Sequence, residues 1–159
     1  MINRVILAQT NRPVDTVRYW RESGDMELNP PYQRGLVWGK IRKRNLIYSI
    51  LRGIPIPSII INDRASAGWD EKISCAVVDG KQRISAILDF LDGKLFIPGE
   101  WFDMEGEIAF ADIPLPRQRG FRLTPIQFCE GRLKSIEEEI EVFELINFGG
   151  VAQGDKDED

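Results

Sequence analysis

The sequence predicts a single α+β domain in which helices flank a small mixed sheet. Two continuous apolar runs, residues 58–62 and 73–78, are typical of buried strands. Ile84, Ile87, Leu88 and Leu91 follow the second run at the spacing of an amphipathic helix. The 159 residues are 43% hydrophobic and 29% charged, a balance that provides a core and a soluble surface for one domain.

The first half of the chain alternates helices with proline-rich connections. A short helix is expected over residues 15–22, because Gly24 ends it and a proline pair, Pro30 and Pro31, follows. A second helix is expected over residues 38–52, with an apolar stripe and a stop at Gly53. This helix leads through two more prolines into the first buried strand.

The second half repeats this alternation. The helix that follows the second buried strand ends at Gly93, and residues 101–113 are expected to form β structure and loops. Residues 125–128 are expected to form a further strand. A last helix is indicated by the apolar spacing of Ile136, Ile140, Phe143 and Ile146. We therefore expect a domain over residues 1–150, followed by an acidic, disordered tail over residues 151–159.

Several absences restrict the function. The chain contains no histidine, which excludes HNH-type nucleases, Ser-His-Asp triads and nearly every zinc enzyme. The two cysteines, Cys75 and Cys129, lie in apolar stretches without a CxxC spacing and suit buried, reduced thiols, with a disulfide as the alternative. No apolar run approaches the roughly 20 residues of a membrane span, and no signal-peptide pattern opens the chain. We expect a cytoplasmic protein with no membrane partner.

The segment Asp79-Gly80-Lys81-Gln82-Arg83 joins a buried strand directly to a helix. A helix N-terminus presents unpaired N–H groups that suit a phosphate. Lys81 and Arg83 oppose the helix macrodipole unless an anion lies between them. The alternative for Asp79 and Gln82 is a capping box, in which the two side chains only cap the helix.

A second group of cations opens the preceding helix. Lys40, Lys43 and Arg44 project on its apolar side, at the rim of the core, and are candidates for contact with DNA. Arg34 lies between turns marked by proline and glycine and is a candidate anion contact, because arginine binds phosphate in a bidentate manner. Trp38 reads as a core residue.

Three ordered motifs in this chain resemble those of a known family. Pro31-Tyr32-Gln33-Arg34, Trp38 and residues 46–57 resemble its PxYQR…W…LIxSILxGxPIP signature. Residues 79–83 resemble its DGQQR motif, and residues 142–150 its VFxxINxGG segment. The family is the N-terminal domain of GmrSD-type modification-dependent restriction enzymes, a branch of the ParB/sulfiredoxin-like superfamily.

The resemblance implies a ParB/sulfiredoxin-like fold that binds and hydrolyses a nucleoside triphosphate (ATP, GTP or CTP) with Mg²⁺. Asp79 would hold the metal or orient a nucleophile, and Gln82 would position water, so these two are the candidate catalytic residues. The expected nucleotide contacts are Arg34, Gly80, Lys81, Arg83, Asn147, Gly149 and Gly150. In two respects the chain departs from the family: Lys81 replaces the first Gln of DGQQR, and the HNH nuclease domain of full-length relatives has no counterpart here.

The leading hypothesis is an NTP-hydrolysing domain acting in a DNA-directed process such as restriction, defence or phage DNA metabolism. A separate nuclease or effector chain would then be a partner, and a second copy of this chain is a further candidate. One alternative is a phosphotransferase that uses the same site on a hydroxyl of a small molecule or modified DNA base. Another is a non-catalytic module for DNA or partner binding whose nucleotide site is vestigial.

Overall fold

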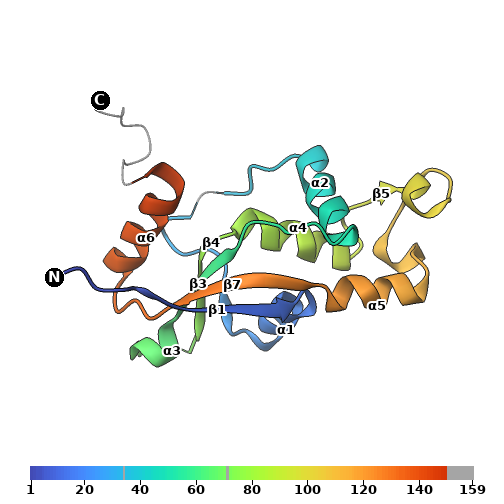
Figure 1. Ribbon diagram of the computed structural model, residues 1–159. Helices are drawn as coiled ribbons and strands as arrows, with labels where there is room; N and C mark the ends of the chain where they lie inside the picture. Colours follow the sequence, from blue (N-terminus) through green and yellow to red (C-terminus); the bar gives the residue numbers. More distant parts are fainter. Residues whose placement is uncertain (34, 71, 150–159) are drawn as a thin grey trace.

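A five-stranded mixed sheet forms the centre of the protein (Figure 1). The computed structural model describes residues 1–33, 35–70 and 72–149. Along the sheet the strands are β1 (Ile6–Pro13), β7 (Pro125–Gly131), β3 (Ile59–Asp63), β4 (Cys75–Asp79) and β2 (Met26–Glu27). The β1–β7 and β3–β4 pairs are antiparallel, and the β7–β3 and β4–β2 pairs are parallel. The predicted α+β class with a small mixed sheet is confirmed.

Helices surround this sheet. In Figure 1, α2 and α4 lie above it, α6 lies at one end, and α5 lies at the other end beside a small two-stranded sheet. None of the helices in the described ranges is both long and apolar enough to cross a bilayer. The remaining elements are α1 (Asp15–Ser23), α2 (Lys40–Leu51), α3 (Arg64–Ala67), α4 (Lys81–Leu91), β5 (Ile97–Pro98), η1 (Gly99–Phe102), β6 (Glu107–Ile108), η2 (Phe110–Asp112), α5 (Leu115–Leu123) and α6 (Ile136–Phe148).

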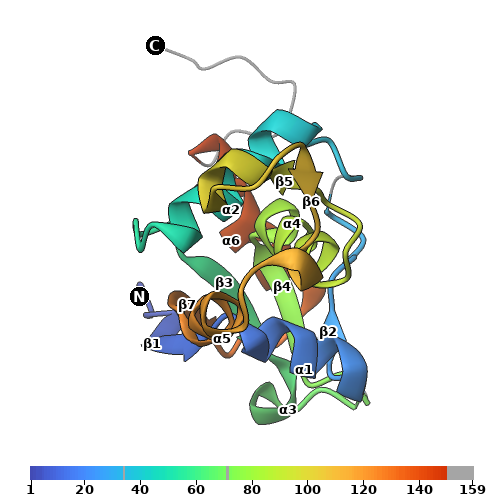
Figure 2. The same cartoon turned by 90° about the vertical axis from the view of Figure 1, so that its right-hand side faces the viewer.

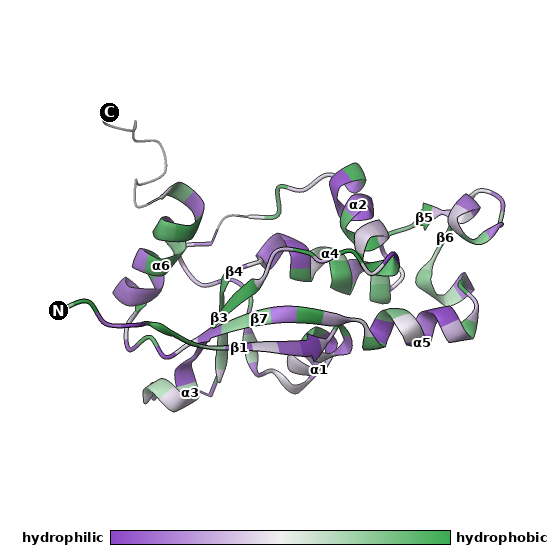
Figure 3. Ribbon diagram, in the orientation of Figure 1, coloured by the Kyte–Doolittle hydropathy of each residue, from purple (hydrophilic) through white to green (hydrophobic). Residues whose placement is uncertain are grey.

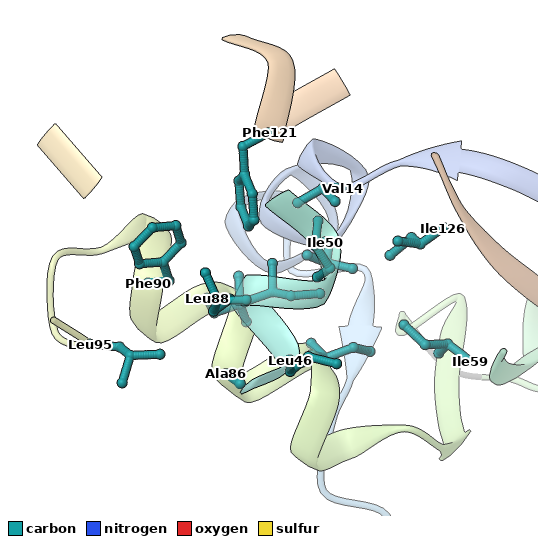
Figure 4. Packing of buried hydrophobic residues seen from close by; sticks show 14 of the residues in the cluster. Val14, Leu46, Ile50, Ile59, Ala86, Leu88, Phe90, Leu95, Phe121 and Ile126 are labelled. Carbon is teal, nitrogen blue, oxygen red and sulfur yellow. The ribbon is translucent and has the colours of Figure 1, made fainter. Parts of the chain in front are cut away.

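The central helix α4 organises the core. Its apolar face, which includes Ile84, Ile87 and Phe90, is fully buried, and Figure 4 shows this face packed against α2, α5 and the sheet. The Phe90 ring makes edge contacts with Phe110 and Phe121, each at 5.2 Å between ring centroids. Burial of several large apolar side chains contributes about 1.5–3 kcal/mol each. The start of α4 is therefore held rigidly against the sheet.

Most predicted elements are present, with small shifts at their ends. The helix predicted over residues 38–52 begins at Lys40, and the strand predicted over residues 125–128 continues to Gly131. Gly24, which follows α1, has a left-handed φ of 74° and accounts for the stop predicted there. The acidic tail predicted over residues 151–159 lies outside the described residues.

Several elements were not predicted: the edge strand β1, the helix α5 and the short segments β2, α3 and β5. The edge strand β1 alternates between half-buried and exposed residues without a strong apolar run, so its sequence signal is weak. The helix α5 has Gly120 in its interior, and glycine lowers its intrinsic helix propensity. Tertiary contacts stabilise it instead: Phe121 enters the core, and the Arg122 guanidinium donates to both carboxylate oxygens of Asp15, with Nη2–Oδ2 at 3.0 Å.

The two cysteines lie on separate buried strands. Cys75 in β4 and Cys129 in β7 are both free thiols, so the expectation of buried, reduced cysteines is confirmed and the alternative of a disulfide is wrong. Burial raises the pKa of the Cys75 thiol to about 12. Cys75 is therefore a protonated core residue at neutral pH.

Candidate functional site

The candidate site is the point where β4 runs into α4 through Gly80. This residue has a φ of +115°, and a Cβ placed there would lie 3.1 Å from Cγ1 of Ile59. Local packing therefore requires glycine whether or not a ligand approaches. Gly80 is also the N-cap of α4, and no side chain caps the helix. The alternative of a capping box between Asp79 and Gln82 is thus wrong.

Two cations open α4 in a buried setting. Lys81 is only 7% exposed, and the side chain of Arg83 is 14% exposed. Nη2 of Arg83 lies 2.9 Å from Oδ2 of Asp79 and 2.9 Å from the Ser58 carbonyl oxygen. Nε of Arg83 is buried and has no hydrogen-bond partner among the described residues. The structure thus places Asp79, Gly80, Lys81 and Arg83 at the start of α4, and their contact with a nucleotide stays a prediction.

Gln82 has a different position from the one predicted for a catalytic residue. Its Nε2 donates to the Gly35 carbonyl at 2.9 Å, and its Oε1 accepts from the Val37 and Trp38 amides at 3.1 and 3.4 Å. Both ends of the amide therefore hold the segment that leads into α2. The Gln82 side chain thus holds the backbone of this segment in place. A role for Gln82 in positioning water stays a prediction.

The segment before α2 is also tied to β4. Nε2 of Gln33 donates to the carbonyls of Val77 and Val78 at 2.9 and 2.7 Å. The Tyr32 hydroxyl donates to Oε2 of Glu139 at 2.9 Å, and its ring packs against Phe143 of α6. Burial, together with the Glu139 carboxylate, raises the pKa of Tyr32. Arg34, between two anchored neighbours in sequence, lies outside the described residues, as does Gly150.

A buried charged network, absent from the sequence-based prediction, supports this region. Glu139 is fully buried and accepts from Nε and Nη2 of Arg64, both at 2.8 Å, and from Nδ2 of Asn62 at 2.8 Å. Glu139 stands in an acidic run, a pattern that is typical of a solvated helix face. Its spacing could have identified it, since it lies three residues after Ile136 and four before Phe143, on the apolar stripe.

The third motif reaches the same region from α6. Val78 packs in one cluster with Val142, Phe143 and Phe148. Nδ2 of Asn147 donates to the Phe143 carbonyl at 2.8 Å, and Gly149 ends the helix with a φ of +63°. This end of α6 is an ordinary helix cap. A nucleotide contact by Asn147 or Gly149 stays a prediction, although all three motifs converge on the carboxyl end of β4.

The cations of α2 have partners within the protein. Nζ of Lys40 lies 3.0 Å from Glu107, which also pairs with Arg44, and Nζ of Lys43 lies 2.8 Å from Asp89. Arg42 places its guanidinium 4.8 Å from the ring centre of Trp38. These pairs neutralise the start of α2 within the protein, so its cations give no physical reason for an external anion. Contact of Lys40, Lys43 and Arg44 with DNA stays a prediction.

The site offers limited means of holding a metal. No group of three or more Asp, Glu, Cys or His side chains that could hold an ion occurs within residues 1–33, 35–70 and 72–149. Asp79 is the carboxylate at the junction, and it pairs with Arg83. One carboxylate suits Mg²⁺ only where phosphate oxygens and waters complete the coordination. Figure 3 shows the hydrophilic start of α4 against its more apolar remainder.

Comparison with known proteins identifies a family. A family model described as GmrSD restriction endonuclease, N-terminal domain, matches residues 20–157. This range contains all three motifs and excludes β1. No curated protein and no solved structure matches the chain.

Proposed function

Because the chain belongs to the GmrSD restriction endonuclease N-terminal domain family, we propose that it binds and hydrolyses a nucleoside triphosphate within a restriction system. The observation that carries the proposal is the start of α4, an uncapped helix end with the buried Lys81 and with Arg83, whose Nε is buried without a partner among the described residues. Cations at this end oppose the helix dipole, and burial adds to the cost of their charge. A bound polyphosphate reverses both effects.

The residues of the β4–α4 junction have different roles in this proposal. Backbone N–H groups of the first turn, with Lys81 and Arg83, bind phosphate oxygens. The buried Nε of Arg83 supplies a donor that the described protein does not use. Asp79 is the residue that would hold Mg²⁺, and the ion, when bound, would neutralise phosphate charge.

The chemistry must proceed without histidine. A carboxylate is then the natural group to accept a proton from attacking water, and Asp79 is the one at the junction. Gln33 and Gln82 keep the segment before α2 against this junction, so they act as positioning residues. Cleavage of DNA by an HNH-type centre would require residues outside this sequence.

The direct test is phosphate release from ATP, GTP and CTP with Mg²⁺, with and without DNA. Asp79→Asn should abolish release. Asp92→Asn is the matched control, since Asp92 also pairs with an arginine, Arg21, but follows the opposite end of the same helix. If neither the wild type nor the control Asp92→Asn releases phosphate, the proposal of hydrolysis is overturned. Phosphate found on an added hydroxyl acceptor, instead of free in solution, identifies a phosphotransferase.

A further inference from the structure

A cavity lies far from the candidate site, at the end of the molecule that carries α5 (Figure 2 looks onto this side). The carboxyl end of α2, the turn η1 and the helix α5 enclose it. Its volume is about 460 Å³, within the range of roughly 300–1,000 Å³ that is usual for small-molecule sites. We call it the α2–α5 cavity.

The floor and one wall of the α2–α5 cavity are apolar and aromatic. Ile50 and Phe121 are each only 2% exposed. Tyr48 and Trp101 stand beside them, with ring centroids 4.8 Å apart and planes inclined at 55°. Tyr48 is partly open to solvent, with 38% of its surface exposed. These rings offer a flat ligand a surface for stacking.

The rim of the cavity is positive. Arg52 and Arg117 line it, and its lining contains no Asp or Glu. Neither arginine forms an ion pair with a carboxylate in the described part of the chain. Nη1 of Arg52 donates to the Tyr48 hydroxyl at 2.8 Å, which holds one guanidinium beside the aromatic wall. Two guanidinium groups without carboxylates favour an anion that can accept paired hydrogen bonds, as a phosphate does.

A glycine keeps the cavity open. Gly120 lies within α5 and lines the cavity, and a Cβ placed there would meet no atom within 4 Å. Glycine inside a helix costs about 1 kcal/mol relative to alanine. Neither a positive φ nor a close neighbour requires glycine at this position. A larger side chain would instead occupy the space.

We propose that the α2–α5 cavity binds a nucleoside phosphate, with the base against Tyr48 and Trp101 and the phosphate between Arg52 and Arg117. This site is separate from the start of α4, and it assigns a function to the motif around residues 46–57, which the candidate nucleotide site does not use. The ligand is either a free nucleotide or one nucleotide unit of a DNA strand. Both present the same base and phosphate.

The test is calorimetric titration of two probes, the four deoxynucleoside monophosphates and a short single-stranded oligonucleotide. It is carried out on the Arg83→Ala protein, so that the proposed triphosphate site does not contribute. Arg117→Ala should weaken binding about 10- to 100-fold, by loss of a charged hydrogen-bonding group. Arg119→Ala, an exposed arginine of the same helix that does not line the cavity, should leave binding unchanged.

Gly120→Leu provides the decisive variant, because it fills the cavity while improving helix propensity. It should abolish binding without lowering the thermal unfolding temperature. Binding of a monophosphate identifies a free nucleotide as ligand, and binding of the oligonucleotide alone identifies a DNA strand. Binding of neither probe, or binding that survives Gly120→Leu, overturns the proposal. Phosphate release from triphosphates is measured separately on Gly120→Leu with Arg83 intact, so failure here leaves the function proposed for α4 untouched.

Discussion

Two helices of this protein begin with cations, and they differ in how far the protein satisfies those cations. At α2, Lys40, Lys43 and Arg44 all pair with carboxylates from β6 and α4, and the side chains of Lys43 and Arg44 are only 17% and 18% exposed. At α4, Arg83 is similarly enclosed, with 14% of its side chain exposed, and it pairs with Asp79, but its Nε is buried without a partner among the described residues. Only the start of α4 therefore holds a buried donor that is available to a bound anion.

An unused donor explains the difference. A cation that is already paired with carboxylates of the protein gains little from an external anion. A buried donor without a partner has lost its hydration without a hydrogen bond in return, so it favours a ligand that accepts from it. A buried unpaired donor, and not burial or the number of cations alone, therefore distinguishes the candidate ligand site from the charged start of α2.

The largest effect is expected where a buried carboxylate is removed. Glu139→Ala leaves Arg64, Asn62 and Tyr32 without an acceptor that each now uses. We expect a loss of about 3 kcal/mol in the free energy of unfolding, measured by denaturant titration. Glu107→Ala is the control, since it also removes the partner of two cations but at the surface. Equal destabilisation by both changes would show that the burial of Glu139 adds nothing to the energy of its ion pair.

A smaller effect is expected at Gln82, and it separates positioning from catalysis. Gln82→Ala removes the acceptor of the Val37 and Trp38 amides. Those amides should exchange their hydrogens about fivefold faster, in keeping with the loss of roughly 1 kcal/mol per hydrogen bond. Hydrogen exchange with mass spectrometry measures this. A fall in turnover with unchanged exchange would show instead that Gln82 acts on the reacting water.

The smallest effect concerns the titration of Glu107. Hydrogen bonds from Arg44 and then Lys40 lower the pKa of this carboxyl below its ordinary value. Its ion pairs therefore stabilise the fold above the unfolded pKa, near pH 4.3, and are lost as pH falls through the lower folded pKa. Arg44→Ala should move the Glu107 pKa back toward its ordinary value, as followed by NMR titration. An unmoved pKa would mean that the α2 pairs are not formed in solution.

Local sequence signals predicted the elements that bury an apolar stripe, and they predicted the β4–α4 junction with its glycine. They could not predict the partners of the cations, because Glu107 lies 67 residues from Lys40 and 63 from Arg44. The buried role of Glu139 was hidden by its acidic neighbours. The edge strand β1 and the helix α5 depend on tertiary contacts that no short window contains. The sequence thus indicated where the candidate site lies, but it did not predict the hydrogen bonds that Gln82 and Arg83 form within the protein.

A triphosphate that binds at the start of α4 should depend on Arg83 for its affinity. ATP, GTP and CTP are titrated with Mg²⁺ by calorimetry into the wild-type protein, Arg83→Ala and Arg42→Ala, after each variant is shown to unfold at a temperature close to that of the wild type. We expect Arg83→Ala to weaken affinity for the preferred nucleotide about 10- to 100-fold. The control Arg42→Ala removes a guanidinium that stacks on Trp38 away from this helix start, and it should leave the affinity unchanged. Equal affinities in all three proteins would show that no triphosphate binds at the start of α4.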